Sequence, residues 1–215
     1  MAKVRSIIEI SGTLSEITFV DSKAYGTHAR AKRGTYTPIT LPDGMQKSAK
    51  VQTQVNQLAK VVFDAVNTFV PGFKNGKLWP RLLSIFRQQN KLGKNYSYKD
   101  FDLMEIRVDH PTSKQGSFRL ASRGEKTVQL HYQLGEEATY RIRLLRMASD
   151  ATLLNPYPTE MLEITITHSP ETKVALLTFS NPPENANLLY VLHCDRLIND
   201  QPSEILKYQG VKFFG

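Results

Sequence analysis

Cysteine is almost absent from this chain. Cys194 is the only cysteine among 215 residues, so an internal disulfide is impossible and a zinc site built from several cysteines is excluded. No apolar run is long enough to span a membrane. Lys3 and Arg5 give the N-terminus a positive start, but Glu9 interrupts its apolar stretch and no small-residue cleavage site follows. We therefore expect a protein without a signal peptide, cytoplasmic or part of an assembled particle.

Motifs that bind phosphates, cofactors or metals are also missing. The sequence contains neither a G-x-G-x-x-G loop nor a G-x-x-x-x-G-K-[S/T] loop. Its five histidines stand singly, without the spacing that metal ligands show. We therefore expect no cofactor, no metal ion and no enzymatic activity.

One triplet, His193-Cys194-Asp195, places a nucleophile, a base and a carboxylate in a row. Neighbouring side chains of a strand point to opposite faces, so His193 and Asp195 are expected on the face opposite Cys194. Cys194 would share its face with Leu188, Tyr190 and Leu192. We interpret it as a buried structural cysteine beside a His–Asp pair on the surface, and not as an activated thiol.

Charge is divided unevenly along the chain. Residues 1–100 carry sixteen Lys/Arg against six Asp/Glu, whereas residues 101–215 carry twelve against fourteen. Such a basic stretch predicts contact with a polyanion or with an acidic protein surface. The candidate contact residues are Lys23, His28, Arg30, Lys32, Arg33, Lys47 and Lys50. The alternative is a mildly basic solvated surface.

Residues 4–41 predict three short strands, at 4–10, 16–20 and 25–31, separated by turn residues. A ribbon of two or three short strands is marginally stable by itself in water. We therefore expect this ribbon to lie on the helices, to join another sheet or to pair with another chain.

Residues 45–70 predict an amphipathic helix, because apolar residues recur at steps of three and four. They are Val51, Val55, Leu58, Val62, Val66 and Phe69. Pro71 and Gly72 end this helix. A second helix is expected after Gly76, with Pro80 tolerated in its first turn. The short connection favours an antiparallel helical hairpin.

After residue 100 the apolar pattern changes to alternation. It predicts strands at 104–108, 117–122, 127–132, 139–147, 162–167, 173–179, 188–197 and 206–214. Glu136 and Glu137 are expected in a solvated hairpin turn between two of them, and not as paired catalytic carboxylates. Arg141 and Arg143 are expected to point outward, because Tyr140, Ile142 and Leu144 point inward.

The expected fold is therefore α+β. An N-terminal β-ribbon and an α-helical hairpin would occupy residues 1–100, and an antiparallel β-sandwich of the immunoglobulin or fibronectin type would occupy residues 101–215.

The order of elements resembles an uncharacterised family of small Bacteroidota proteins with a phage-type structural character. The resemblance is carried by Ser11-Gly12-Thr13, by Tyr25-Gly26 with Arg30, and by the amide-bearing helix positions Gln52, Gln54, Asn56 and Gln57. It implies a non-enzymatic building block with a terminal fibronectin-like sandwich.

The leading hypothesis is a non-enzymatic structural or assembly protein whose basic N-terminal region docks onto a protein partner or onto a further copy of the chain. The alternative is an architectural protein that binds nucleic acid without sequence preference, through the cations of residues 23–50.

Overall fold

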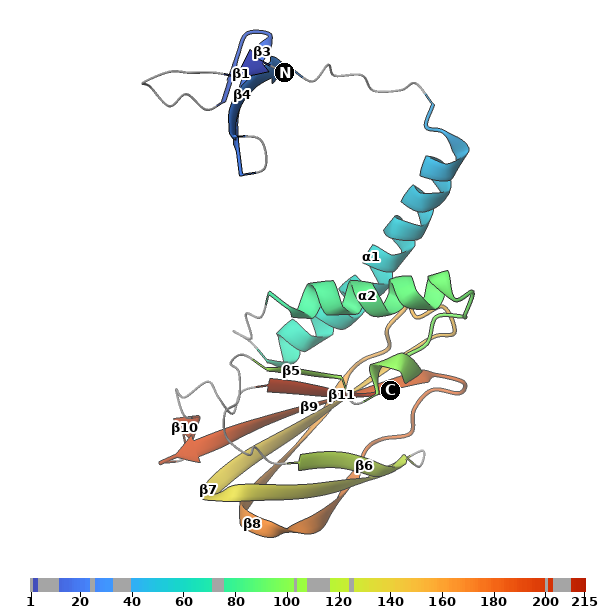
Figure 1. The fold of residues 1–215 in the computed structure, drawn as a ribbon. Helices are drawn as coiled ribbons and strands as arrows, with labels where there is room; N and C mark the ends of the chain where they lie inside the picture. The colour runs from blue at the N-terminus through green and yellow to red at the C-terminus, as the bar shows by residue number, and fades with distance from the viewer. Residues whose placement is uncertain are drawn as a thin grey trace. The chain divides into compact units, whose positions relative to one another are not determined.

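This computed structural model describes residues 2–3, 12–23, 26–32, 40–70, 76–102, 104–107, 117–123, 126–199, 201–202 and 210–215 (Figure 1). The chain forms two compact units, residues 1–46 and residues 47–215.

The first unit is a small antiparallel sheet with the strand order β1-β4-β3-β2. Its strands are β1 (Ala2–Lys3), β2 (Gly12–Leu14), β3 (Ile17–Ser22) and β4 (Gly26–Ala31). Ser15 has a positive φ of 52° in the tight turn that pairs Leu14 with Ile17. The strands predicted at 16–20 and 25–31 are thus present, while the one predicted at 4–10 lies outside the described residues.

Helix α1 (Asp43–Phe69) follows Pro42 and carries the expected apolar stripe. Val55, Leu58, Val62 and Val66 are almost completely buried. Helix α2 (Leu78–Lys91) has Pro80 in its first turn, as the sequence predicts. Gly93 (φ +65°) terminates α2, where a left-handed backbone favours glycine. A short 3₁₀ helix, η1 (Lys99–Phe101), follows.

The remaining strands form one seven-stranded sheet with the order β5-β11-β9-β7-β6, in which β8 pairs with β7 and β10 with β9. The strands are β5 (Glu105–Arg107), β6 (Ser117–Arg123), β7 (Thr127–Ser149), β8 (Glu160–Thr178), β9 (Asn187–Ile198), β10 (Gln201–Pro202) and β11 (Gly210–Phe214).

The predicted turn at Glu136 and Glu137 is wrong. Strand β7 runs through these residues, so that two expected strands form one strand of 23 residues. Its register with β8 shifts between Tyr132 and Leu134 and again between Leu134 and Thr139. Such irregularities bend a strand without reversing it. The polar, glycine-containing segment therefore marks a bend.

Because β7 and β8 bend together, the sheet folds back on itself. We call the two halves of the folded sheet its lobes, and a hydrophobic core lies between them. That core contains Val128, Leu130, Ile142, Leu144, Leu192 and Phe214. The helices cover the opposite face of one lobe (Figure 1). The second core contains Leu58, Val62, Leu82, Phe86, Leu145, Val191 and Phe213.

The α+β class with a C-terminal β-sandwich is confirmed, whereas the immunoglobulin or fibronectin type is not. The domain boundary predicted at residue 100 stays a prediction, and the two compact units divide at residue 46. Residues of both helices share a hydrophobic core with the sheet. None of the described helices is long and apolar enough to cross a membrane.

Candidate functional site

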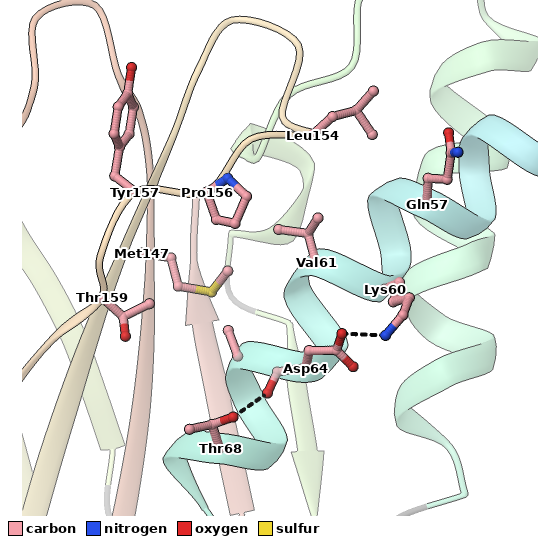
Figure 2. A pocket seen from close by; sticks show the side chains of 11 residues that line it. Gln57, Lys60, Val61, Asp64, Thr68, Met147, Leu154, Pro156, Tyr157 and Thr159 are labelled. Carbon is pink, nitrogen blue, oxygen red and sulfur yellow. Dashed lines mark hydrogen bonds and ion pairs between the residues drawn. The ribbon is translucent and has the colours of Figure 1, made fainter.

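A groove runs along one flank of α1 and has a volume of about 610 Å³. Its lining residues on the helix recur at steps of three and four, which places them on one side of α1. The groove is lined by Gln57, Lys60, Val61, Asp64, Ala65, Thr68, Met147, Leu154, Pro156, Tyr157 and Thr159. The side chains of Val61, Met147 and Pro156 converge between α1 and the segment after β7 (Figure 2). The size and the apolar floor suit a bound side chain or ligand.

The polar rim of the groove belongs to α1. Lys60 donates to the carboxylate of Asp64, and Thr68 Oγ1 donates to the backbone oxygen of Asp64 at 2.9 Å (Figure 2). The Lys60 and Asp64 side chains are 67% and 56% exposed. An ion pair this exposed contributes little to stability. The pair therefore offers a neutral, hydrated rim.

The opposite wall is a well-anchored loop between β7 and β8. Asp150 accepts hydrogen bonds from Thr152 Oγ1 at 2.8 Å and from Asn155 Nδ2 at 2.7 Å. These hydrogen bonds lower the pKa of the Asp150 carboxyl. Leu153 is buried beneath the loop. The bonds hold the wall in place, so the groove is largely preformed.

A buried arginine fixes the start of β8 beside the groove. Arg146 is 5% exposed and donates to Glu160 Oε2 at 2.8 Å and to the Ser180 backbone oxygen at 2.9 Å. Its guanidinium lies 4.7 Å from the ring centroid of Phe179. Through these contacts Arg146 connects Glu160, the first residue of β8, with Ser180, which follows the last residue of β8. The connection holds the two ends of the bent strand together. A second, smaller cavity of about 380 Å³ adjoins this cluster and shares Tyr157 and Thr159 with the groove.

Strand β8 begins beside the groove, and within the part of the chain that the structure describes one of its edges is unpaired. Among the described strands, β8 pairs with β7 alone over its 19 residues. Three of its apolar side chains are 50% or more exposed, namely Met161, Val174 and Leu176. A long edge strand with exposed apolar residues can accept a further strand.

The His–Asp pair predicted on the surface is instead buried. His193 is 1% and Asp195 3% exposed. The prediction was wrong because Phe69, at the end of α1, covers this face, with its ring centroid 6.3 Å from that of His193. Strand alternation correctly placed both residues opposite Cys194.

Two partly buried arginines, whose side chains are 25% and 15% exposed, contact this buried pair. Arg141 Nη2 donates to Asp195 Oδ2 at 2.7 Å, and Arg143 Nη2 donates to the same oxygen at 3.2 Å. Arg143 Nη2 also lies 2.9 Å from His193 Nδ1. An arginine can only donate, so Nδ1 is the acceptor and His193 is neutral. Burial lowers the pKa of His193 to about 4, against the attraction of Asp195.

Cys194 lies in the core between the two lobes, with Tyr190 and Leu192. Burial raises the pKa of its thiol strongly. A thiol in this environment is a poor nucleophile, and it lies on the other face of β9 from His193. The arrangement does not form a catalytic triad. Among the described residues, no three His, Cys, Asp or Glu side chains gather closely enough to hold a metal ion.

The candidate contact residues of the basic stretch are distributed over both units. Lys23 and Lys32 are exposed in the first unit, and Lys47 and Lys50 are exposed on α1. Arg30 is half-buried on β4. His28 is 7% exposed, and its Nδ1 lies 3.0 Å from the Gly26 oxygen. Arg33 lies outside the described residues.

The groove and the arginine clusters are features that the sequence did not predict. The groove joins residues about ninety positions apart, for which the sequence carries no local signal. The alternation of Arg141 and Arg143 with apolar residues predicts their outward orientation, but it does not predict that both contact Asp195 on the neighbouring strand.

No family model matches the chain, and no curated protein matches it. Among solved structures, it is similar to the E. coli curli protein CsgC, with 14% identity over 38% of this chain and 85% of that chain and a TM-score of 0.25. A similarity at this level supports no conclusion about function.

Proposed function

We propose that this chain is a non-enzymatic assembly protein that docks a strand of a second copy on the open edge of β8. The observation that carries the proposal is the 19-residue β8 edge, with Met161, Val174 and Leu176 exposed. Unpaired backbone groups along such an edge bind an extended segment through main-chain hydrogen bonds.

The groove supports an extended occupant. It opens at Thr159, next to the first residue of β8. A strand added at this edge presents alternate side chains to the face on which α1 lies. An apolar side chain near the start of β8 then enters the groove between Val61 and Pro156. Main-chain hydrogen bonds to β8 provide the affinity for the added strand. The groove selects the register in which this strand pairs with β8.

The first unit supplies the complementary surface. Leu14 is 72% and Ile17 48% exposed, and these residues face each other on paired strands. Among the described strands, β2 lies at one end of its sheet. Residues 1–46 contain six Lys/Arg against four Asp/Glu, whereas residues 160–178 contain three Glu and one Lys. The opposite charges favour contact between the first unit of one copy and β8 of another.

Light scattering coupled to size exclusion tests the proposal on the full chain over a range of concentrations. The wild type is expected to form dimers or larger species. The variant Leu176→Lys is expected to dissociate, because it introduces a charge on the edge. Leu92→Lys is the matched control, since Leu92 is 58% exposed on the loop after α2 and Leu176 is 67% exposed. Circular dichroism checks that both variants fold.

A mixing experiment tests the direction of the contact. If the first unit of one copy meets β8 of another, the interface is heterologous. Leu14→Lys and Leu176→Lys variants, each monomeric alone, are then expected to form a heterodimer when mixed, because one intact interface remains. A strictly monomeric wild type, or equal association of Leu176→Lys and the wild type, contradicts the proposal.

A further inference from the structure

The positive charge of the second unit is concentrated on its helices. Residues 65–99 contain no aspartate or glutamate but seven lysines and arginines. This stretch includes the whole of α2 (Leu78–Lys91). The helices cover one face of the sheet (Figure 1), so the cations of α2 lie on that side of this unit.

The packing of α2 determines which of its side chains reach solvent. Leu78, Leu82, Phe86 and Gln89 are buried against the core. The opposite side carries the charges and several uncharged polar groups, all of them exposed. The exposed charged and polar residues of α2 and of its flanking residues are Lys77, Arg81, Ser84, Arg87, Gln88, Asn90, Lys91, Lys94 and Asn95. We call this set the α2 face.

One cation of the α2 face is held in position without losing its charge. Arg87 donates through Nη2 at 2.8 Å and through Nε at 3.2 Å to Oε1 of Gln52 on α1. Because Gln52 is a neutral acceptor, the guanidinium keeps its full positive charge. Gln52 is itself bonded to Asn56 at 2.6 Å. This contact already restricts the Arg87 side chain. Arg87 therefore loses less conformational entropy when it binds an anion.

We propose that the α2 face binds the phosphate backbone of double-stranded nucleic acid without sequence preference. From Lys77 to Lys91 the helix rises about 21 Å, which corresponds to about six base pairs of duplex. Uncharged donors such as Ser84 and Gln88 lie between the cations, and phosphate oxygens accept bonds from such groups as well as from Lys and Arg.

The composition of the face distinguishes this partner from other polyanions. Binding of single strands relies on aromatic side chains that stack on bases, and the α2 face contains none. Insertion into a membrane surface requires apolar residues on the exposed side. Trp79, Leu83 and Ile85 pack against the core between the helices and the sheet, and Leu92 is the exposed large apolar residue within residues 76–102. One exposed leucine among several cations provides little apolar area for insertion into a membrane surface.

The expected affinity follows from counterion release. If Arg81, Arg87, Lys91 and Lys94 each neutralise one phosphate, the slope of log K against log salt is about −3.6. Raising the salt from about 50 to 200 mM then weakens binding about 150-fold. Fluorescence anisotropy with two unrelated duplexes of about 20 base pairs measures both quantities.

A matched pair of variants localises the contact. The triple variant Arg81→Gln, Lys91→Gln, Lys94→Gln is expected to reduce the slope by about 2.7 for both duplexes. The control Lys23→Gln, Lys32→Gln, Lys126→Gln removes the same charge from exposed residues elsewhere and is expected to leave the slope nearly unchanged. The control also tests the basic stretch predicted from sequence.

Three results would overturn the inference. The first is an absence of binding to either duplex at about 50 mM salt. The second is an equal loss in both triple variants, which would indicate a response to net charge alone. The third is tighter binding to polyglutamate, to a single strand of the same length or to vesicles containing phosphatidylserine than to duplex. The β8 variant Leu176→Lys leaves the α2 face intact. Failure of the duplex-binding experiment can therefore be distinguished from failure of the assembly proposal.

Discussion

Acidification is expected to destabilise this protein through His193. His193 is 1% exposed and neutral, because Arg143 donates to its Nδ1. Protonation would break this hydrogen bond and would place a third cation beside Arg141 and Arg143, with Asp195 as the one carboxylate of the cluster. The folded state therefore resists protonation. The ordinary pKa of 6.5 falls to about 4 in the folded protein.

The sign and size of the effect follow from linkage. Between pH 6.5 and about pH 4 the unfolded state binds the proton and the folded state does not, so stability rises with pH in this interval. The contribution of His193 is complete above pH 6.5, decreases as the pH falls and is lost below about pH 4. For this difference in pKa the loss between about pH 8 and pH 5 is about 2 kcal/mol.

Urea unfolding followed by Trp79 fluorescence measures this loss, because Trp79 is the only tryptophan and packs against Phe63 in the second unit. His193→Asn retains an acceptor near the position of Nδ1 but does not titrate. The variant is expected to be less stable at every pH, with a shallower pH dependence than the wild type between pH 8 and pH 5. Equal pH dependence in the two proteins would refute the reasoning.

Two further predictions concern buried groups. Cys194 is expected to resist a thiol reagent in the native protein and to react with one equivalent in urea, because burial raises its pKa; rapid native reaction would reopen the question of a nucleophilic role. Arg146→Met is expected to lower the free energy of unfolding by about 3 kcal/mol, since it leaves Glu160 and Ser180 without their buried cation. Lys173→Met, at an exposed position of β8, is the control and is expected to change stability by less than about 0.5 kcal/mol. Similar losses in both variants would argue against a closing role for Arg146.

Local patterns in the sequence predicted much of the fold. The three- and four-residue steps of Val55, Leu58 and Val62 gave α1 its buried side, because helical geometry alone decides which residues share a face. Alternation placed Cys194 opposite His193 for the same reason. Pro80 marked the first turn of α2, where a missing amide hydrogen costs little.

The failures share one cause. A polar segment such as residues 134–137 is compatible with a reversal or with a bend, and only the pairing of β7 with β8 selects the bend. Likewise, alternation specifies the face of Arg141, but it does not say what covers that face. The register with β9 places Arg141 opposite Asp195.

The sequence by itself determined the periodicities, and through them which side chains of each helix and strand lie together, because these follow from backbone geometry over a few residues. The tertiary structure decided that Phe69 covers His193 and Arg143, that α1 and the loop after β7 enclose a groove, and that β8 pairs with β7 alone among the described strands. These features depend on contacts between residues that are distant in the chain. The free energy of such contacts arises from burial and the exclusion of water, which occur only when the helices and strands have packed.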